Sequence, residues 1–563
     1  MKKYNSREEV PIEYKWDLND FYKNELEYNE DYDKAYNIIK NLINYKGKLK
    51  DSEQLLEFLE QMTLSLSILF NLEGYAYLKN DELLGIDKNI ERITKVQNLA
   101  SEYSQNVSFF EPELLSFTKE EYEKLFNEEK LKSYKFYLDS IYREKEHILN
   151  ENEEIIVSKL AHSAGDYESM ASNLLSNEND YGRVFIDGEN ITIARNNFRK
   201  LMKNKDFKIR KEVYDKFYNK IKEYSGTIAS FLNNYCKLND EIAKIHHFDN
   251  AWDRNLFNLN LSNKVFETLK EETENNLESL HKYYKLRKKV LGLDELSIYD
   301  LSLPLSKSDK EYSIEEAQKI ILEAIKPLGE DYYKHFKKIF DNHYIDYCQY
   351  KGKCSGGYSL STYDKDSRIL LSYNYDFDSI STIAHEGGHN VNHQYVIENN
   401  DLIYRMIPNI RAEVMSLTNE CLLSNYMFKN GKREEKLIGL ENIIDVIISN
   451  LFGAVREGKI EQEMYKIIED NGTLTKENLS KLVSDSLDKY YGNNVKKDDL
   501  SNLSWALRSH YYSDYYLFSY AICVSVACNV AKEIINGNID MLDKYMKFLS
   551  VGDNMWTSDA FKI

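Results

Sequence analysis

The chain of 563 residues has few residues that interrupt helices or cross-link a fold. Only 5 prolines occur, and none lies between Pro112 and Pro304, so long helices can form without a break. The six cysteines include no CxxC pair, and a chain of this size needs no disulfides, so we expect a reduced, cytoplasmic protein. No Gly/Ser/Pro-rich linker is present, which indicates one integrated body rather than a string of small domains.

An excess of basic charge and a long apolar run are also missing. The net charge of −19 disfavours nucleic acid as a partner, because binding phosphates requires clustered Lys and Arg. The first 16 residues carry positive charge without an apolar stretch, unlike a secretory signal. The longest nearly apolar run, "YAICVSVACNVA" at 520–531, is too short to span a bilayer. We therefore expect no nucleic-acid or membrane partner, and the oligomeric state stays unknown.

Most of the chain shows the apolar spacing of helices, with apolar residues three and four positions apart. Residues 52–78 and 151–175 are clear examples. Residues 357–379 differ, because their Ser, Tyr, Leu and Ile content predicts a hairpin or two short strands, with "DKD" (364–366) as the turn. We predict a mainly α fold with this small β element ahead of a helix. The predicted domains are a helical domain at 1–200 and a second domain at 201–563 that carries the chemistry.

The segment "TIAHEGGHNVNHQY" (382–395) combines three histidines with a glutamate in a helical context. His385 and His389 are four residues apart, so both imidazoles can reach one ion with bonds of about 2.0–2.1 Å. Glu386 points beside that ion, which is the HExxH arrangement of zinc hydrolases with the glutamate as general base. His393 lies about 12 Å from His385 along the helix axis, so we expect it to support or pack rather than bind the ion.

The third ligand must come from another helix. Residues 407–423, "IPNIRAEVMSLTNECLL", predict a helix that begins near Pro408. Glu413 lies in its first full turn and faces the histidines if the two helices pack together. Glu420, seven residues further on nearly the same face, is placed to orient a ligand histidine through its second ring nitrogen. The predicted cofactor is one Zn²⁺ per chain, held by His385, His389 and Glu413.

Three further motifs accompany these two helices. They are "YKWDLNDFY" (14–22), "KCSGGYS" (353–359) and "WALRSHYYSDYYLFSYA" (505–521). Together the motifs resemble the thimet oligopeptidase family of zinc metallopeptidases, and most closely its bacterial oligoendopeptidase F branch. The resemblance implies a large helical zincin-type fold with a deep central substrate channel. It also implies an endopeptidase that hydrolyses internal bonds of short, unstructured oligopeptides.

The resemblance assigns further roles residue by residue. It implies that His510 and Tyr520 donate hydrogen bonds to the oxyanion, with Tyr512 as a further substrate-binding residue. Gly356, Gly357 and Tyr358 would align the substrate backbone, with the strand at 368–375 sharing this task.

Two positions depart from the family pattern. Ser513 stands where the family has a tyrosine, so it is open which tyrosine besides Tyr520 supports the oxyanion. Gly387 stands where the family usually has a larger residue. Our hypothesis is that Gly387 leaves space for the substrate or for a neighbouring aromatic ring.

Two alternatives remain open from the sequence. The first is a zinc carboxypeptidase or dipeptidase, for which the sequence shows no clear clamp for a terminal charge. The second is a non-enzymatic helical peptide-binding protein with a degenerate motif. The intact set of His385, Glu386, His389 and Glu413 argues against the second alternative.

Overall fold

The computed structural model describes residues 4–149, 151–175, 179–306 and 310–563. Its described part is mainly helical, and its short strands form a two-stranded and a three-stranded sheet. This confirms the predicted mainly α fold with a small β element directly before the HEGGH helix.

The chain divides into two compact units, each built from separated stretches of sequence. Unit 1 comprises Met1–Glu146, Asp309–Gly439 and Val526–Ile563, and unit 2 comprises His147–Ser308 and Leu440–Ser525. The domain boundary that the sequence predicts near residue 200 falls inside unit 2 and stays a prediction.

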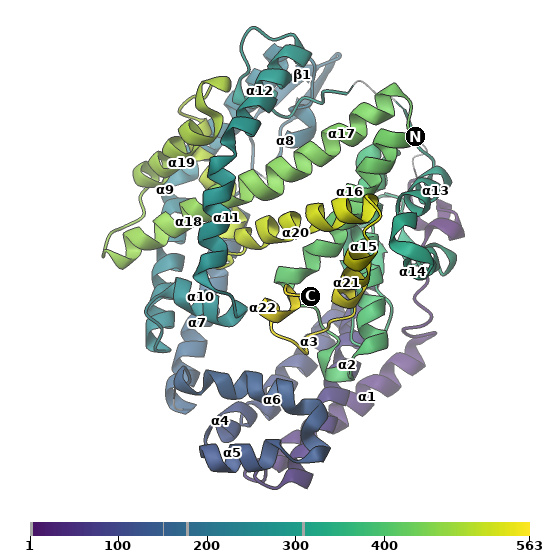
Figure 1. Cartoon of the computed structure of the whole chain (residues 1–563), viewed down its shortest axis with the longest axis vertical. Coiled ribbons are helices and arrows are strands. Elements are labelled where there is room, and N and C mark those ends of the chain that lie inside the picture. Colours follow the sequence, from purple (N-terminus) through teal and green to yellow (C-terminus); the bar gives the residue numbers. More distant parts are fainter. Residues whose placement is uncertain (1–3, 150, 176–178, 307–309) are drawn as a thin grey trace. The chain divides into compact units, whose positions relative to one another are not determined.

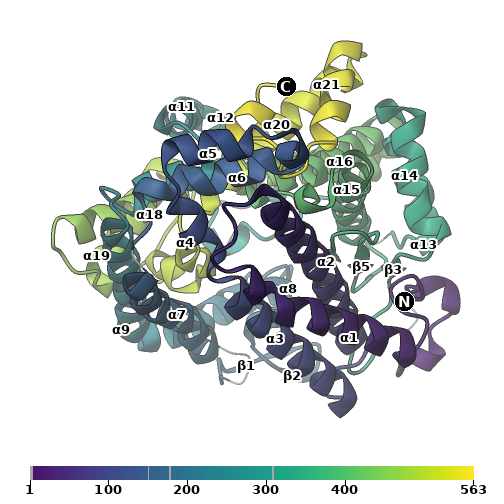
Figure 2. The same cartoon turned by 90° about the horizontal axis from the view of Figure 1, so that it is seen from below.

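The first long helices of unit 1 form a three-helix group. Figure 2 shows α1 (Glu25–Leu42), α2 (Ser52–Glu82) and α3 (Asp87–Val107) side by side. The side chain of Asp51 accepts hydrogen bonds from the first free backbone N–H groups of α2, which fixes where that helix begins. The buried faces of this group enclose a core that includes Leu370 of the three-stranded sheet. The N-terminal helices therefore support the sheet that precedes the HEGGH helix.

The remaining helices of unit 1 include the pair that carries the metal-site motifs. They are α4 (Phe110–Leu115), α5 (Lys119–Phe126), α6 (Lys135–Tyr142), α13 (Ile314–Ala324), α14 (Gly329–Asp341), α15 (Phe377–Asn399), α16 (Asn409–Asn430), α21 (Ile539–Leu549) and α22 (Thr557–Ala560). Figure 1 shows α15 and α16 side by side.

The three-stranded sheet of unit 1 contains the predicted hairpin. Strand β4 (Tyr358–Leu360) pairs antiparallel with β5 (Arg368–Leu370), and Ser359 lies opposite Ile369. A third strand, β3 (Ile345–Asp346), pairs parallel with β5, so the order is β3-β5-β4 and β4 lies at an edge. The predicted hairpin is confirmed. Strand β3 could not be predicted from the sequence, because two residues are too few to show the alternating pattern of a strand.

Unit 2 is organised around α9 (Phe207–Ile245), which is 39 residues long. Its other helices are α7 (Glu151–Leu174), α8 (Arg195–Leu201), α10 (Ala251–Leu259), α11 (Asn263–Asn275), α12 (Leu277–Leu291), α18 (Ala454–Glu469) and α19 (Lys476–Tyr491), and its hairpin pairs β1 (Arg183–Ile186) with β2 (Glu189–Thr192). Helices α17 (Arg433–Ile447) and α20 (Leu517–Ile535) contain residues of both units. A π-helical segment, Ile448–Gly453, joins α17 to α18.

Three helical stretches of the described chain are long and apolar enough to cross a membrane by length and composition alone. They are Ser52–Glu82, Arg433–Glu469 and Leu517–Ile535. The last of these contains the apolar run at 520–531, which by itself is too short to span a bilayer. Flanking residues extend the helix around this run to 19 residues. In their most apolar windows, 61%, 28% and 56% of the residues are buried inside the fold.

Candidate active site

Helix α15 carries the HEGGH motif, and its packing against α16 depends on Gly388. A Cβ added at Gly388 would lie 2.8 Å from Cα of Ser416 and 2.9 Å from the carbonyl oxygen of Met415. Glycine therefore lets the backbones of the two helices approach closely. The side chain of Asp376 caps α15 by accepting a hydrogen bond of 2.9 Å from the Ser379 backbone N–H.

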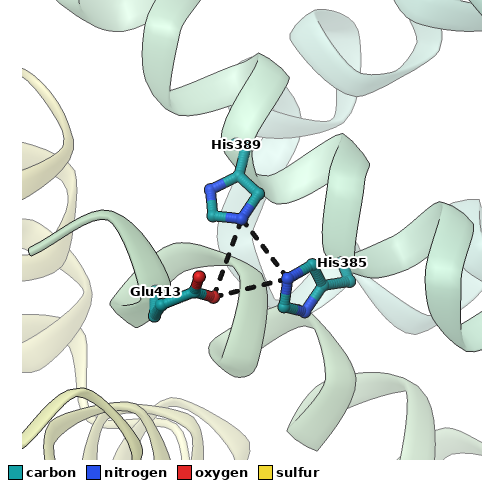
Figure 3. A group of neighbouring side chains, drawn as sticks. All are labelled: His385, His389 and Glu413. Atoms are coloured by element: carbon teal, nitrogen blue, oxygen red, sulfur yellow. Dashed lines mark hydrogen bonds and ion pairs between the residues drawn. The ribbon is translucent and has the colours of Figure 1, made fainter. Parts of the chain in front are cut away.

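The structure brings the three predicted metal ligands together. Nε2 of His385 lies 3.3 Å from Nε2 of His389, and Oε2 of Glu413 lies 3.3 Å and 3.7 Å from these two atoms, respectively. Figure 3 shows the two imidazoles and the carboxylate converging from α15 and α16. The hydroxyl of Ser416 donates a 2.8 Å hydrogen bond to Oε2 of Glu413 and holds the carboxylate in place.

Glu420 orients the first histidine, as its position in the sequence suggests. Its Oε1 lies 2.7 Å from Nδ1 of His385, so Glu420 holds the Nδ1 proton and Nε2 is the nitrogen directed toward an ion. Burial lowers the pKa of His385, but the hydrogen bond and charge of Glu420 outweigh burial and raise this pKa to about 9. Burial, followed by the charge of His385, lowers the pKa of His389 to about 4.

Glu386 is buried on α15, next in sequence to His385. The pKa of Glu386 is raised, chiefly by burial and also by the negative charges of Glu413 and Glu420. The charge of His385 and a hydrogen bond from the Ser359 backbone lower this pKa but do not cancel the effect of burial. Glu386 therefore lies beside β4, which contains Ser359, and its carboxylate is a stronger base than an exposed one.

His393 does not belong to the metal group. Its Nδ1 lies 3.0 Å from the Ser367 hydroxyl, and burial lowers the pKa of the ring to about 4. The group of converging ligand atoms found in the described chain contains only His385, His389 and Glu413. The spacing argument against His393 as a ligand therefore agrees with the structure.

Gly387 makes room for an aromatic ring. A Cβ at this position would collide with the ring of Phe336 on α14. Of the two occupants that the sequence suggests, the structure places the neighbouring aromatic in this space. Phe336 itself is fully buried, so its ring cannot move aside into solvent without losing that burial.

The predicted substrate strand lies at the edge of the sheet. Gly356 adopts φ +112°, a conformation that favours glycine, and its N–H donates to the Ser372 hydroxyl at 3.1 Å. Gly357 packs against Thr382 of α15, where a Cβ would lie 2.9 Å from the threonine methyl group. The Tyr358 hydroxyl donates a 2.7 Å hydrogen bond to Asp81, so this residue offers its backbone rather than its side chain.

The late histidine and tyrosines lie in unit 2. His510 belongs to a 3₁₀ turn, Ser509–Tyr512, while Tyr520 lies on α20, yet their ring centroids are 5.9 Å apart. Tyr516, which the sequence analysis did not single out, contacts both rings, with centroid distances of 6.1 Å to His510 and 5.3 Å to Tyr520. Tyr512 instead packs edge-on against Tyr235, with ring centroids 5.3 Å apart.

Comparison with known proteins decides the family. Peptidase family M3 matches residues 200–563, and Oligopeptidase F matches residues 113–180. The chain belongs to peptidase family M3. This membership confirms the predicted metallo-oligopeptidase, and thimet oligopeptidase is the name of the wider family.

Similar proteins cover almost the whole chain. The chain is 30% identical to the group B oligopeptidase PepB of Streptococcus agalactiae, across 98% of this chain and 92% of that protein. It is 29% identical to the oligopeptidase PepF of Bacillus subtilis, across 99% and 84%. The crystal structure of oligoendopeptidase-F from Enterococcus faecium aligns with a TM-score of 0.73 at 25% identity, across 96% and 93%.

Proposed function

We propose that this M3 peptidase is a zinc-dependent endopeptidase that hydrolyses internal peptide bonds of short, unstructured oligopeptides. The observation that carries the proposal is the convergence of His385 and His389 of α15 with Glu413 of α16, beside Glu386. Helix α15 also packs against the edge strand β4. The oligopeptidase names of the relatives support a short peptide as the substrate.

The donor set fits zinc. Two imidazole nitrogens and one carboxylate oxygen suit Zn²⁺, whereas Ca²⁺ and Mg²⁺ prefer sites made of oxygen. Tetrahedral bonds of about 2.05 Å place ligand atoms about 3.3 Å apart. The separations of 3.3, 3.3 and 3.7 Å are close to this value, so the side chains need little rearrangement.

Glu386 is the general base of the proposed reaction. Bound zinc would supply Lewis acidity that polarises the scissile carbonyl and acidifies the attacking water. The Glu386 carboxylate accepts the proton of that water and then passes it to the leaving amine. Its raised pKa suits both steps, because a carboxylate with a pKa closer to neutrality accepts and releases protons more evenly.

The edge of β4 would hold the substrate backbone by strand addition. Because the sheet order leaves β4 paired only with β5, one side of this strand is without a strand partner in the described chain. The roles of His510 and Tyr520 at the oxyanion and the deep channel stay predictions from the resemblance. The cytoplasmic location stays a prediction from the cysteine content of the sequence.

The test is Glu386→Gln, measured with zinc content and with cleavage of an internally quenched fluorescent peptide. We expect one zinc per chain in both proteins and a loss of turnover of about 10²–10⁴-fold in the variant. Glu398→Gln, an exposed position on the same helix, is the matched control and should cleave normally. Wild-type turnover in Glu386→Gln would refute the base assignment.

A second arm separates internal from terminal cleavage. The quenched peptide is acetylated at its N-terminus and amidated at its C-terminus, and the products are mapped by mass spectrometry. An endopeptidase still cleaves this peptide, and removal of the metal with a chelator stops the reaction until zinc is restored. Cleavage only of peptides with a free end would instead support the carboxypeptidase or dipeptidase alternative.

A further inference from the structure

Unit 2 contains a cavity of about 480 Å³ that the proposed chemistry does not explain. Its walls come from α8, α12, α18, α19 and α20, from the turns around His510, and from the π-helical segment Ile448–Gly453. π-Helical segments within α-helices are rare, and those that occur are often found at functional sites. His510 and Tyr520, which the family resemblance associates with the substrate, both line this cavity.

The cavity is positively charged, although the chain has a net charge of −19. Three guanidinium groups line it, from Arg199, Arg456 and Arg508, and they face a single carboxylate, Glu457. An excess of fixed positive charge inside a recess attracts an anionic ligand and concentrates it there.

Glu457 neutralises only part of this charge. Arg456 donates a hydrogen bond to Oε1 of Glu457, and the Tyr511 hydroxyl donates a 2.6 Å hydrogen bond to its Oε2. Burial alone would raise the pKa of Glu457, but Arg508 and Arg456 outweigh burial and lower this pKa to about 2. The Glu457 carboxylate therefore stays ionised at neutral pH, and the three guanidinium groups leave an excess of positive charge in the cavity.

Two of the three arginines remain available. Arg508 touches Glu457 only at 3.4 Å through Nη2, and its side chain is 37% exposed. Arg199 is exposed, and within the described chain its guanidinium has no hydrogen-bond or ion-pair partner. A guanidinium with free N–H groups binds a carboxylate through two parallel hydrogen bonds.

We propose that this cavity binds a carboxylate of the peptide substrate through Arg199 and Arg508. The inference rests on the proposed peptidase function and adds a preference for anionic peptides. The carboxylate can come from the free C-terminus or from an Asp or Glu side chain.

The first measurement is binding without turnover. Zinc-loaded Glu386→Gln is titrated with four fluorescent peptides of one length: a free acid, its C-terminal amide, and amides with an internal Glu or Gln. If the C-terminus is bound, the free acid binds about tenfold more tightly than the amide. If a side chain is bound, the Glu peptide binds more tightly than the Gln peptide by about the same factor.

The second measurement assigns the preference to the cavity. In the otherwise wild-type enzyme, Arg199→Gln should raise KM about tenfold for the preferred peptide and leave kcat and the melting temperature nearly unchanged. Arg199→Lys should retain part of the preference. Lys200→Gln removes a charge from an exposed neighbour on α8 that does not line the cavity, and it should change nothing.

The outcomes separate this inference from the proposed function. Equal affinity for all four peptides, or an unaltered preference in both Arg199→Gln and Arg508→Gln, overturns the cavity assignment while the peptidase activity stands. A zinc-loaded wild-type enzyme that cleaves none of the peptides overturns both.

Discussion

Nδ1 of His385 lies 2.7 Å from Oε1 of Glu420, which joins the HEGGH helix to the next helix through a charged hydrogen bond. The Ser381 hydroxyl donates to the other oxygen of the same carboxylate at 3.1 Å. Because both oxygens are engaged, the carboxylate cannot rotate away, and His385 keeps Nε2 directed toward His389 and Glu413. The ligand geometry therefore depends on a residue that does not itself contact the ion.

Replacing Glu420 should weaken metal binding without removing a ligand. We expect Glu420→Gln to raise the Kd for zinc about tenfold and Glu420→Ala up to about 100-fold, because supporting partners of metal-binding histidines contribute this much. Competition with a chromophoric chelator measures the Kd, and Glu398→Gln is the control on α15. An unchanged Kd in Glu420→Ala would show that the hydrogen bond has no role in metal binding.

Metal binding should depend on pH through His385. With its pKa raised to about 9, His385 is protonated at pH 7 in the metal-free protein, while His389, with a pKa of about 4, is neutral. Zinc must displace that proton, so the apparent affinity should rise about tenfold per pH unit between pH 7 and 9. Calorimetry in buffers of different ionisation enthalpy should detect release of about one proton at pH 7. Affinity that is flat over this range would contradict the assigned protonation.

The same shift predicts how the stability of the metal-free protein varies with pH. The pKa of His385 is higher in the folded chain than the ordinary value of 6.5, so the proton stabilises the fold. That contribution is fully present below pH 6.5 and is lost as the pH rises through about 9. Melting temperatures of the metal-free protein should therefore fall across this window, and His385→Gln should reduce the fall.

Parts of the site could be predicted because they depend on spacing along one helix. The separation of His385 and His389 and the rejection of His393 follow from the geometry of a single α-helix. Placing Glu413 required one further step, namely that α15 and α16 pack together. The predicted hairpin likewise depends on local sequence and is present.

Other features could not be predicted, because they depend on contacts between distant segments. Phe336 is 51 positions before Gly387, so no local sequence pattern shows that its ring fills the space where a side chain at position 387 would lie. The short strand β3 is likewise recognised only through its pairing with β5, which lies more than twenty positions further along the chain. Arg199 and Arg508 line one cavity only because α8 and the turn before His510 fold together within unit 2.

Gly388→Ala should damage both stability and metal binding. The added Cβ meets the backbone of α16 at 2.8–2.9 Å, and backbone cannot move aside as a side chain can. We expect a loss of about 1–3 kcal/mol in the free energy of unfolding, which exceeds the gain of about 1 kcal/mol in helix propensity. The Kd for zinc should also rise, because the two helices carry different ligands.

Gly226→Ala is the matched control for that variant. Gly226 lies inside α9, and a Cβ there meets nothing within 4 Å. Only the helix propensity changes, so this variant should be stabilised by up to about 1 kcal/mol in chemical unfolding. If Gly388→Ala is stabilised by the same amount, the close approach of α15 and α16 does not require glycine.

Gly387→Ala should destabilise the protein through one ring, and a second substitution tests this directly. The added Cβ collides with Phe336, which is fully buried, so we expect a loss of about 1–3 kcal/mol. Phe336→Leu alone leaves a cavity and should also be destabilising. In the double variant the smaller leucine makes room for the new methyl group, so the double variant should lose less than the two single losses combined. Urea unfolding of the four proteins completes the cycle, and zinc content reports whether the ligands stay in place. Additive losses would mean that Phe336 does not occupy the space that Gly387 leaves.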